Sequence, residues 1–152
     1  MRSKTKNILI FTAIALIFVM LAGVFAKLNN METEKNVGSS AYSVGAISVD
    51  TGKNVESKMS IYMKDMQELD GAEIKLEDDA QISYNIYFYN EEKVFISATQ
   101  NLTSDFDNST APEGAVYFKV QITPNTVDGE AVEVSIFNVS KYANQLNIVV
   151  AK

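Results

Sequence analysis

The chain contains no cysteine, no histidine and no tryptophan. Without cysteine it has no disulfide bond, no thiolate metal ligand and no cysteine nucleophile. Without histidine it lacks the usual general base of hydrolases, the Ser-His-Asp triad and imidazole metal ligands. A pair of carboxylates, as used by glycoside hydrolases, is the main catalytic arrangement left. The placement of the 19 acidic residues singles out no such pair, so we expect a protein without enzymatic activity.

Arginine is almost absent as well, since Arg2 is the only one among 13 basic residues. All 19 acidic residues, but only ten of the basic ones, follow Ala26, which gives that part of the chain a net charge of −9. Nucleic-acid binding depends on clustered lysine and arginine side chains that neutralise phosphates. We therefore expect no nucleic-acid partner. Divalent cations and neutral polymers are better suited to a module of this charge.

The stretch Ile8–Ala26 contains no charged residue and is mainly hydrophobic. As a helix it would span about 28 Å, close to the hydrocarbon thickness of a bilayer. Three basic residues and no acid precede it within residues 1–7. By the positive-inside rule these charges keep residues 1–7 in the cytoplasm and send the rest of the chain outside. We expect either a single-pass anchor in the plasma membrane or a signal segment that is cleaved near Ala26 to release a secreted protein.

Beyond this segment the sequence is typical of short strands. Residues 27–43 are polar and contain a Gly-Ser-Ser run, which predicts a flexible stalk. Over residues 44–152, apolar and polar residues alternate in short stretches that are separated by turn residues. The pattern predicts an all-β domain, an antiparallel β-sandwich of the jelly-roll type, with one of its last strands over residues 131–139. The N-terminal hydrophobic segment, residues 8–26, is the one helix that we expect.

Three stretches carry a resemblance to a known family: "SKMSIYMKDMQELDGAEIKL" (57–76), "ISYNIYFYNEEKVFIS" (82–97) and "APEGAVYFKVQI" (111–122). Together they are similar to galactose-binding-like jelly-roll domains, the carbohydrate-binding and adhesion modules of bacterial surface and phage tail proteins. The resemblance implies a sugar-binding surface. Lys119 stands where such domains often carry an arginine. Lysine keeps the positive charge but cannot form the two parallel hydrogen bonds of a guanidinium group. The tryptophan on which such modules most often stack a sugar ring is absent.

The aromatic residues of two of these stretches form the first candidate ligand site. Tyr87 and Tyr89 alternate with apolar residues and are expected on the opposite face of their strand, and Tyr117 is expected on the same face of a second strand. If the two strands are neighbours, the tyrosines form a patch on which a sugar can stack, with Asn90 and Lys119 as polar contacts. The alternative is structural, because cross-strand aromatic pairs also stabilise the register of a sheet.

An acidic loop forms the second candidate site. Asp105, Asp107 and Asn108 lie close together in "SDFDNS", and carboxylate and amide oxygens are ligands that Ca²⁺ prefers. A second acidic run, Glu77–Asp79, lies elsewhere in the sequence. The glycine and the terminal glutamate of a calcium-binding loop are missing, so solvated surface charge is the alternative. A structural calcium ion is the one cofactor that we consider.

The sequence thus predicts an extracytoplasmic binding module, of bacterial or phage origin, that recognises a glycan or another cell-surface polymer without covalent chemistry. The competing hypothesis is a structural role, in which the domain binds a protein partner as an accessory subunit of a membrane complex or a surface assembly.

Overall fold

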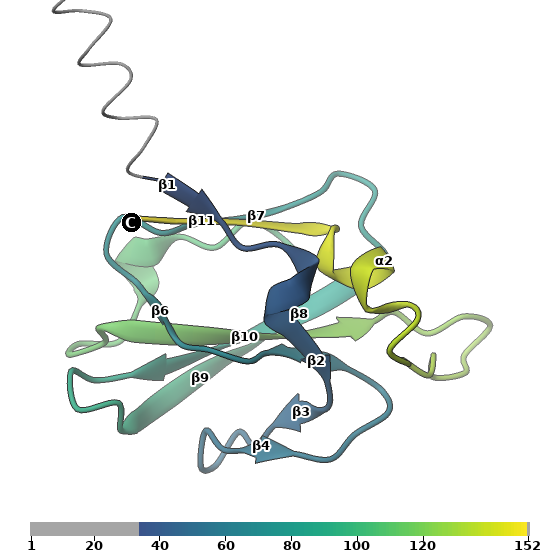
Figure 1. The fold of residues 1–152 in the computed structure, drawn as a ribbon, viewed down its shortest axis with the longest axis horizontal. Coiled ribbons are helices and arrows are strands. Elements are labelled where there is room, and N and C mark those ends of the chain that lie inside the picture. Colours follow the sequence, from purple (N-terminus) through teal and green to yellow (C-terminus); the bar gives the residue numbers. More distant parts are fainter. Residues whose placement is uncertain (1–33, 152) are drawn as a thin grey trace, which may run out of the picture. The chain divides into compact units, whose positions relative to one another are not determined.

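The computed structural model describes residues 34–151, which form mostly antiparallel β-sheets (Figure 1). The hydrophobic segment 8–26 and the basic residues 1–7 lie outside the described residues. Within the described part, no helix is long and apolar enough to cross a membrane. The predicted all-β class is confirmed for this part of the chain.

Two sheets dominate the fold (Figure 1). The smaller sheet has the strand order β1 (Glu34–Asn36), β11 (Leu146–Ala151) and β7 (Glu73–Leu76). The larger sheet runs in the order β2, β5, β10, β8 and β9, and β6 also pairs with β10. The bounds of its strands are β2 (Tyr42–Val44), β5 (Ile61–Met63), β6 (Gln67–Glu68), β8 (Ile82–Tyr89), β9 (Phe95–Leu102) and β10 (Tyr117–Pro124).

The remaining elements are short. A two-stranded hairpin consists of β3 (Ala46–Ile47) and β4 (Asn54–Val55). The helical elements are the α-helix α2 (Val139–Ala143) and two 3-10 turns, η1 (Ser39–Ala41) and η2 (Asn108–Thr110).

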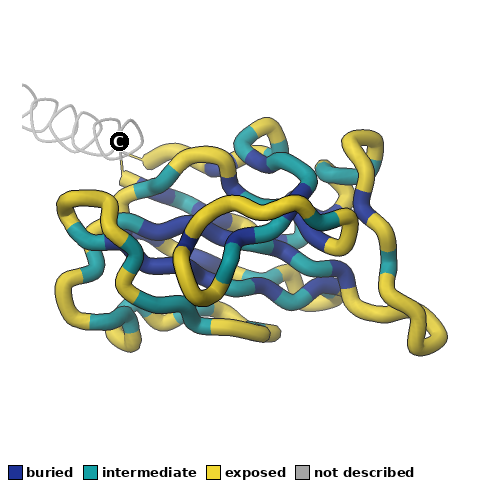
Figure 2. The backbone as a smooth tube through the Cα atoms, turned by 90° about the horizontal axis from the view of Figure 1, so that it is seen from below, coloured by how far each residue is buried: buried dark blue, intermediate teal, exposed yellow. Residues whose placement is uncertain are grey.

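One hydrophobic core joins the two main sheets. Ile74 and Ile148 of the smaller sheet belong to the same buried cluster as Ile86, Phe88 and other residues of the larger sheet. Figure 2 shows buried backbone, in dark blue, along the central strands, and exposed backbone, in yellow, mostly in the connections. Two antiparallel sheets that share one core are compatible with a β-sandwich.

The alternation predicted for the central strands is confirmed. β8 and β10 are antiparallel neighbours, with Ile86 opposite Val120 and Phe88 opposite Phe118. These four side chains are completely buried in the main core. The intervening residues of both strands therefore point to the other face of the larger sheet.

Ordered elements precede residue 44, where the sequence predicts the start of the domain. The predicted stalk, residues 27–43, overlaps the fold, because β1 lies beside β11 and both Val37 and Tyr42 are buried in the main core. In the structure, β1 and the core residues Val37 and Tyr42 therefore belong with the strands that follow residue 44. Val37 and Tyr42 are separated by a short polar turn at η1. They therefore form no alternating pattern that would predict a strand from the sequence.

The strand predicted over residues 131–139 is absent. Val132, Val134 and Ile136 alternate as in a strand, but Ser135–Asn138 is a turn and Val139 begins α2. The side-chain oxygen of Asn138 accepts a hydrogen bond from the Ser135 N–H at 2.8 Å. This side chain closes the turn and takes a backbone donor that a strand would use in its ladder.

Candidate functional site

The predicted tyrosine patch exists, but it lies beneath the β3–β4 hairpin. Within the sheet, Tyr87 of β8 is opposite Lys119 of β10, and Tyr89 is opposite Tyr117, as the hypothesis required. Tyr87 and Tyr89, however, are only 0% and 2% exposed. Together with Ile47 of the hairpin they form a second, smaller hydrophobic cluster on this face.

Polar contacts hold the hairpin over the tyrosines. The Tyr87 hydroxyl donates to the Ile47 carbonyl at 2.8 Å, and the Tyr89 hydroxyl donates to the Gly52 carbonyl at 2.7 Å. The Ile47 N–H donates in turn to the side-chain oxygen of Gln121 at 2.7 Å. Tyr87 and Tyr89 are therefore covered by the hairpin rather than open to solvent. Alternation places a side chain on a face, but it does not show whether a segment 40 residues away covers that face.

Lys119 belongs to the same covered region. It is 6% exposed, its ammonium donates to the side-chain oxygen of Asn54 at 3.0 Å, and it lies 5.2 Å from the centre of the Tyr62 ring. Burial lowers the pKa of Lys119, and the nearby Asp65 carboxylate opposes this effect. In this structure Lys119 thus contacts the hairpin rather than an open surface.

Asn90 and Tyr117 are partly exposed. The side-chain oxygen of Asn90 accepts a hydrogen bond from the Val94 N–H at 2.9 Å, so it stabilises the β8–β9 turn. Tyr117 lies 5.4 Å beneath the ammonium of Lys93. Ligand contacts of these residues, and of Tyr87, Tyr89 and Lys119, remain a prediction.

The predicted calcium ligands mainly satisfy backbone groups. Asp105 accepts a hydrogen bond from the Leu76 N–H at 2.8 Å, and the Asn108 amide donates to the Ala72 carbonyl. Asp107 accepts from the Ser109 N–H at 2.9 Å, and this bond lowers the pKa of the Asp107 carboxyl. Within residues 34–151, no three acidic side chains are grouped closely enough to hold a metal ion. Calcium binding by Asp105, Asp107 and Asn108 remains a prediction.

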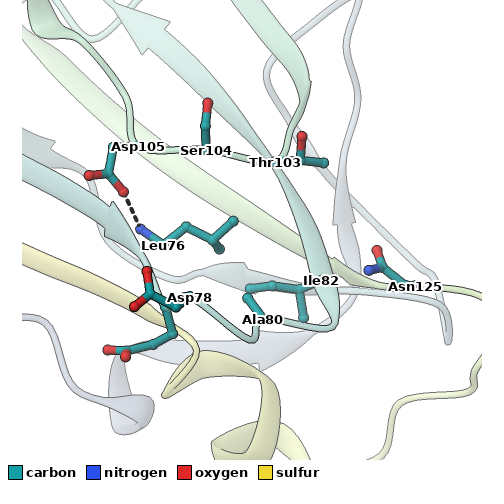
Figure 3. A pocket seen from close by; sticks show the side chains of 9 residues that line it. Leu76, Asp78, Ala80, Ile82, Thr103, Ser104, Asp105 and Asn125 are labelled. Atoms are coloured by element: carbon teal, nitrogen blue, oxygen red, sulfur yellow. Dashed lines mark hydrogen bonds between the residues drawn. The ribbon is translucent and has the colours of Figure 1, made fainter.

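The two acidic loops of the sequence meet at a surface cavity of about 500 Å³ (Figure 3). Asp105 lies on one wall and Asp78 on the other, although 27 positions separate them in the sequence. The cavity combines a partly buried apolar floor with an exposed polar rim. The floor residues are Leu76, Ala80 and Ile82, and the rim residues are Glu77, Asp78, Thr103, Ser104, Asp105 and Asn125.

Local contacts fix the walls of this cavity. The bond from the Leu76 N–H to Asp105, drawn in Figure 3, joins the end of β7 to the loop after β9. The Tyr84 hydroxyl donates to the Ser104 carbonyl at 2.6 Å and holds the same loop against β8. These two contacts fix the position of residues 104–105 relative to β7 and β8.

Several rim groups remain free to bind a ligand. The side chains of Glu77, Asp78, Thr103 and Asn125 have no hydrogen-bond partner among residues 34–151. They offer two carboxylates, a hydroxyl and an amide around an apolar floor. The sequence showed the acidic run at 77–79, but no sequence signal joined it to Thr103 or Asn125, which come from separate connections.

Comparison of the chain with known protein families, with curated proteins and with solved structures finds no match.

Proposed function

We propose that this protein is an extracytoplasmic binding module that recognises a neutral glycan or a similar polyhydroxylated surface polymer in the cavity between Asp78 and Asp105. The supporting observation is the lining of that cavity, where unpaired carboxylate, hydroxyl and amide groups surround an apolar floor. In this proposal residues 8–26 anchor the module in the plasma membrane, or are cleaved to release it.

The cavity has the chemistry that a neutral sugar requires. A carboxylate accepts hydrogen bonds from adjacent sugar hydroxyls, and hydrogen bonds to charged groups contribute about 1.5–3 kcal/mol each. The hydroxyl of Thr103 and the amide of Asn125 both donate and accept, which suits a ligand whose hydroxyls do the same. Leu76, Ala80 and Ile82 offer an apolar surface to the C–H face of the ring. The three carboxylates of the lining would repel an acidic polymer, so the proposed ligand is uncharged.

The cavity is lined largely by connections between strands. Its rim is made by connections: residues 77–81 after β7, residues 103–105 after β9, and Asn125 after β10. Loops that a rigid β scaffold holds in place are common binding positions. This site lies apart from the tyrosine patch, where the β3–β4 hairpin covers the aromatic rings.

A glycan-array screen of the full-length chain in detergent tests the proposal, with one arm in calcium and one in a chelator. The double variant Asp78→Asn/Thr103→Val removes one charge and one hydroxyl from the exposed rim and changes side-chain size little. Tyr117→Ala serves as the matched control on the tyrosine face. We expect the wild type and Tyr117→Ala to bind the same neutral glycans, and the double variant to lose at least tenfold in affinity.

Each other result has a definite meaning. Loss of binding in Tyr117→Ala with retention in Asp78→Asn/Thr103→Val would move the site to the tyrosine face. Binding that requires calcium would add an ion to the site. If no glycan binds in either buffer, the proposal is wrong and a structural role with a protein partner becomes the better hypothesis.

A further inference from the structure

A turn before α2 exposes two large apolar side chains. Ile136 is 77% exposed and Phe137 is 90% exposed. They occupy the two central positions of the turn Ser135–Asn138, on the connection between β10 and α2 (Figure 1). Adjacent exposed apolar residues of this size are a common feature of protein-interaction surfaces.

This turn is anchored on both sides. Val134 is 4% exposed, and its N–H donates to the Lys58 carbonyl at 2.6 Å. The Asn138 side chain closes the turn by accepting from the Ser135 N–H, and Val139 packs against the main core. Ile136 and Phe137 are therefore presented on a fixed support, which lowers the entropy that must be lost when they bind.

A hollow of about 350 Å³ lies next to the exposed pair, with Ile136 on its edge. Its lining contains no Asp, Glu, Lys or Arg and consists of Ser39, Ser40, Tyr42, Ser43, Val44, Ile136, Val139 and Ser140. Four other hollows within the described residues each have at least one Asp or Glu in the lining. The patch thus combines an exposed apolar pair with an uncharged hollow that is rich in serine.

We propose that this patch binds a second copy of the chain, with Phe137 of each copy inserted in the hollow of the other. A protruding ring and a hollow that share one patch are self-complementary, so a two-fold arrangement satisfies both at once. Charge favours the same contact. The chain carries a net charge of −6, and two copies repel each other least where neither presents a charged group.

The proposed contact buries a small surface area, so we expect the dimer to be weak. A buried aromatic residue contributes roughly 150–250 Å², whereas stable interfaces bury about 1,200–2,000 Å² in total. Two phenylalanines and two isoleucines, together with the rims of the hollows, form a weak, concentration-dependent dimer. Confinement of the chain to a membrane through residues 8–26 would raise its effective concentration and favour the pair.

Site-specific cross-linking of the full-length chain in detergent tests the proposal without background, because the sequence contains no cysteine. One tagged chain carries Ser135→Cys at the foot of the turn, and a differently tagged chain carries Ser40→Cys on the hollow. Both residues are exposed. We expect a short bismaleimide to join the two tags. Val127→Cys replaces Ser135→Cys in the control, because Val127 is 62% exposed outside this patch, and this pair should not cross-link.

Two further variants decide whether the patch causes the contact. Adding Phe137→Ser to both chains should reduce the cross-linked product at least tenfold, as should Ser140→Glu, which puts a charge on the lining. Adding Val127→Ser should leave the yield unchanged. Circular dichroism checks that each variant is folded. Absence of the product in the starting pair, or a yield that neither variant changes, would overturn the proposal, since association through other residues would persist in both.

Discussion

At the scale of single residues, the buried tyrosines differ in whether the side-chain hydroxyl has a hydrogen-bond partner. The hydroxyls of Tyr87 and Tyr89 donate to hairpin carbonyls, whereas the buried hydroxyl of Tyr42 has no partner among the described residues. A buried polar group stabilises a fold only when it is paired. The two kinds of tyrosine therefore respond in opposite ways to removal of the hydroxyl.

Tyr87→Phe is expected to lower the free energy of unfolding by about 1–3 kcal/mol, because it leaves the buried Ile47 carbonyl without this donor. Urea unfolding followed by circular dichroism measures the change. The control is Tyr117→Phe, since the Tyr117 hydroxyl donates to no group among the described residues, and its effect should stay below about 0.5 kcal/mol. Equal losses in the two variants would show that the contact to Ile47 contributes nothing.

Tyr42→Phe is expected to leave stability unchanged or to raise it by about 1 kcal/mol, because it removes a desolvated and unpaired hydroxyl while keeping the packed ring. The same urea titration tests this expectation. A loss comparable to that of Tyr87→Phe would mean that the Tyr42 hydroxyl has a partner, for example an internal water molecule.

At the scale of elements, the β3–β4 hairpin determines what the outer face of the larger sheet exposes. It contributes one buried apolar side chain, Ile47. Hydrogen bonds that involve Tyr87, Tyr89, Lys119 and Gln121 also hold it against the sheet. Gly45 lets the chain leave β2 to form the hairpin: its φ is +142°, and a Cβ there would lie 2.7 Å from the Tyr62 ring. Gly45 thus separates β2 from β3.

Gly52→Ala is expected to loosen the hairpin. Gly52 has φ +65°, and a Cβ would lie 2.5 Å from the Phe95 ring. Gly114→Ala is the matched control, because Gly114 has φ +81° but no atom within 4 Å of its Cβ position. Both variants pay the left-handed strain of about 1–2 kcal/mol, and Gly52→Ala adds an overpacking cost of about 1–3 kcal/mol.

Hydrogen exchange shows which part of the Gly52→Ala variant loses stability. In Gly52→Ala the amides of residues 46–55 should exchange faster, while the amides of β8 and β10 keep more of their protection. Urea unfolding gives the global difference between the two glycine variants. If both lose the same stability, the steric contact with Phe95 is unimportant.

At the scale of the whole domain, the buried tyrosines make stability depend on pH in the alkaline range. Burial raises the pKa of Tyr84 and of Tyr89 to about 12, whereas tyrosines of an unfolded chain titrate near 10. Below pH 10 both states are protonated and the two groups add no pH dependence. Between about pH 10 and 12 the unfolded state loses protons that the folded state keeps, so the free energy of unfolding falls as pH rises.

Unfolding monitored across pH 8 to 12 tests this dependence, with tyrosinate absorbance recorded in parallel. We expect stability to be level up to about pH 10 and to fall beyond it. The fall should be shallower in Tyr84→Phe, which removes one of the titrating groups. An identical slope in the variant would show that Tyr84 ionises equally in the folded and unfolded chains.

The extent of the folded unit gives a second test at this scale. Residues 35–151 form one compact unit, and Val37 and Tyr42 are part of its core. A fragment that begins at residue 44 lacks both side chains together with β1 and most of β2. It should have a lower midpoint of thermal unfolding than a fragment that begins at residue 34, because cavities replace buried apolar groups. Equal midpoints would contradict this account of the domain boundary.

The sequence by itself determined the features that depend on local periodicity and on composition. Alternation along residues 82–89 and 117–124 identified the core-facing side chains, because neighbouring side chains of a strand point to opposite faces. The absence of cysteine and histidine excluded disulfide bonds, thiolate and imidazole metal ligands, and catalysis by a cysteine nucleophile or a histidine base. Periodicity failed at residues 131–139, where one asparagine side chain closes a turn within an alternating pattern.

Only the tertiary structure decided which surfaces are open. Tyr87 and Tyr89 are covered by a hairpin from residues 46–55, and the two acidic loops meet although they are far apart in the sequence. Such contacts join segments separated by tens of residues, and local patterns carry no information about them. A strand pattern shows which way a side chain points, while the path of the rest of the chain decides whether it meets solvent, a ligand or its own backbone.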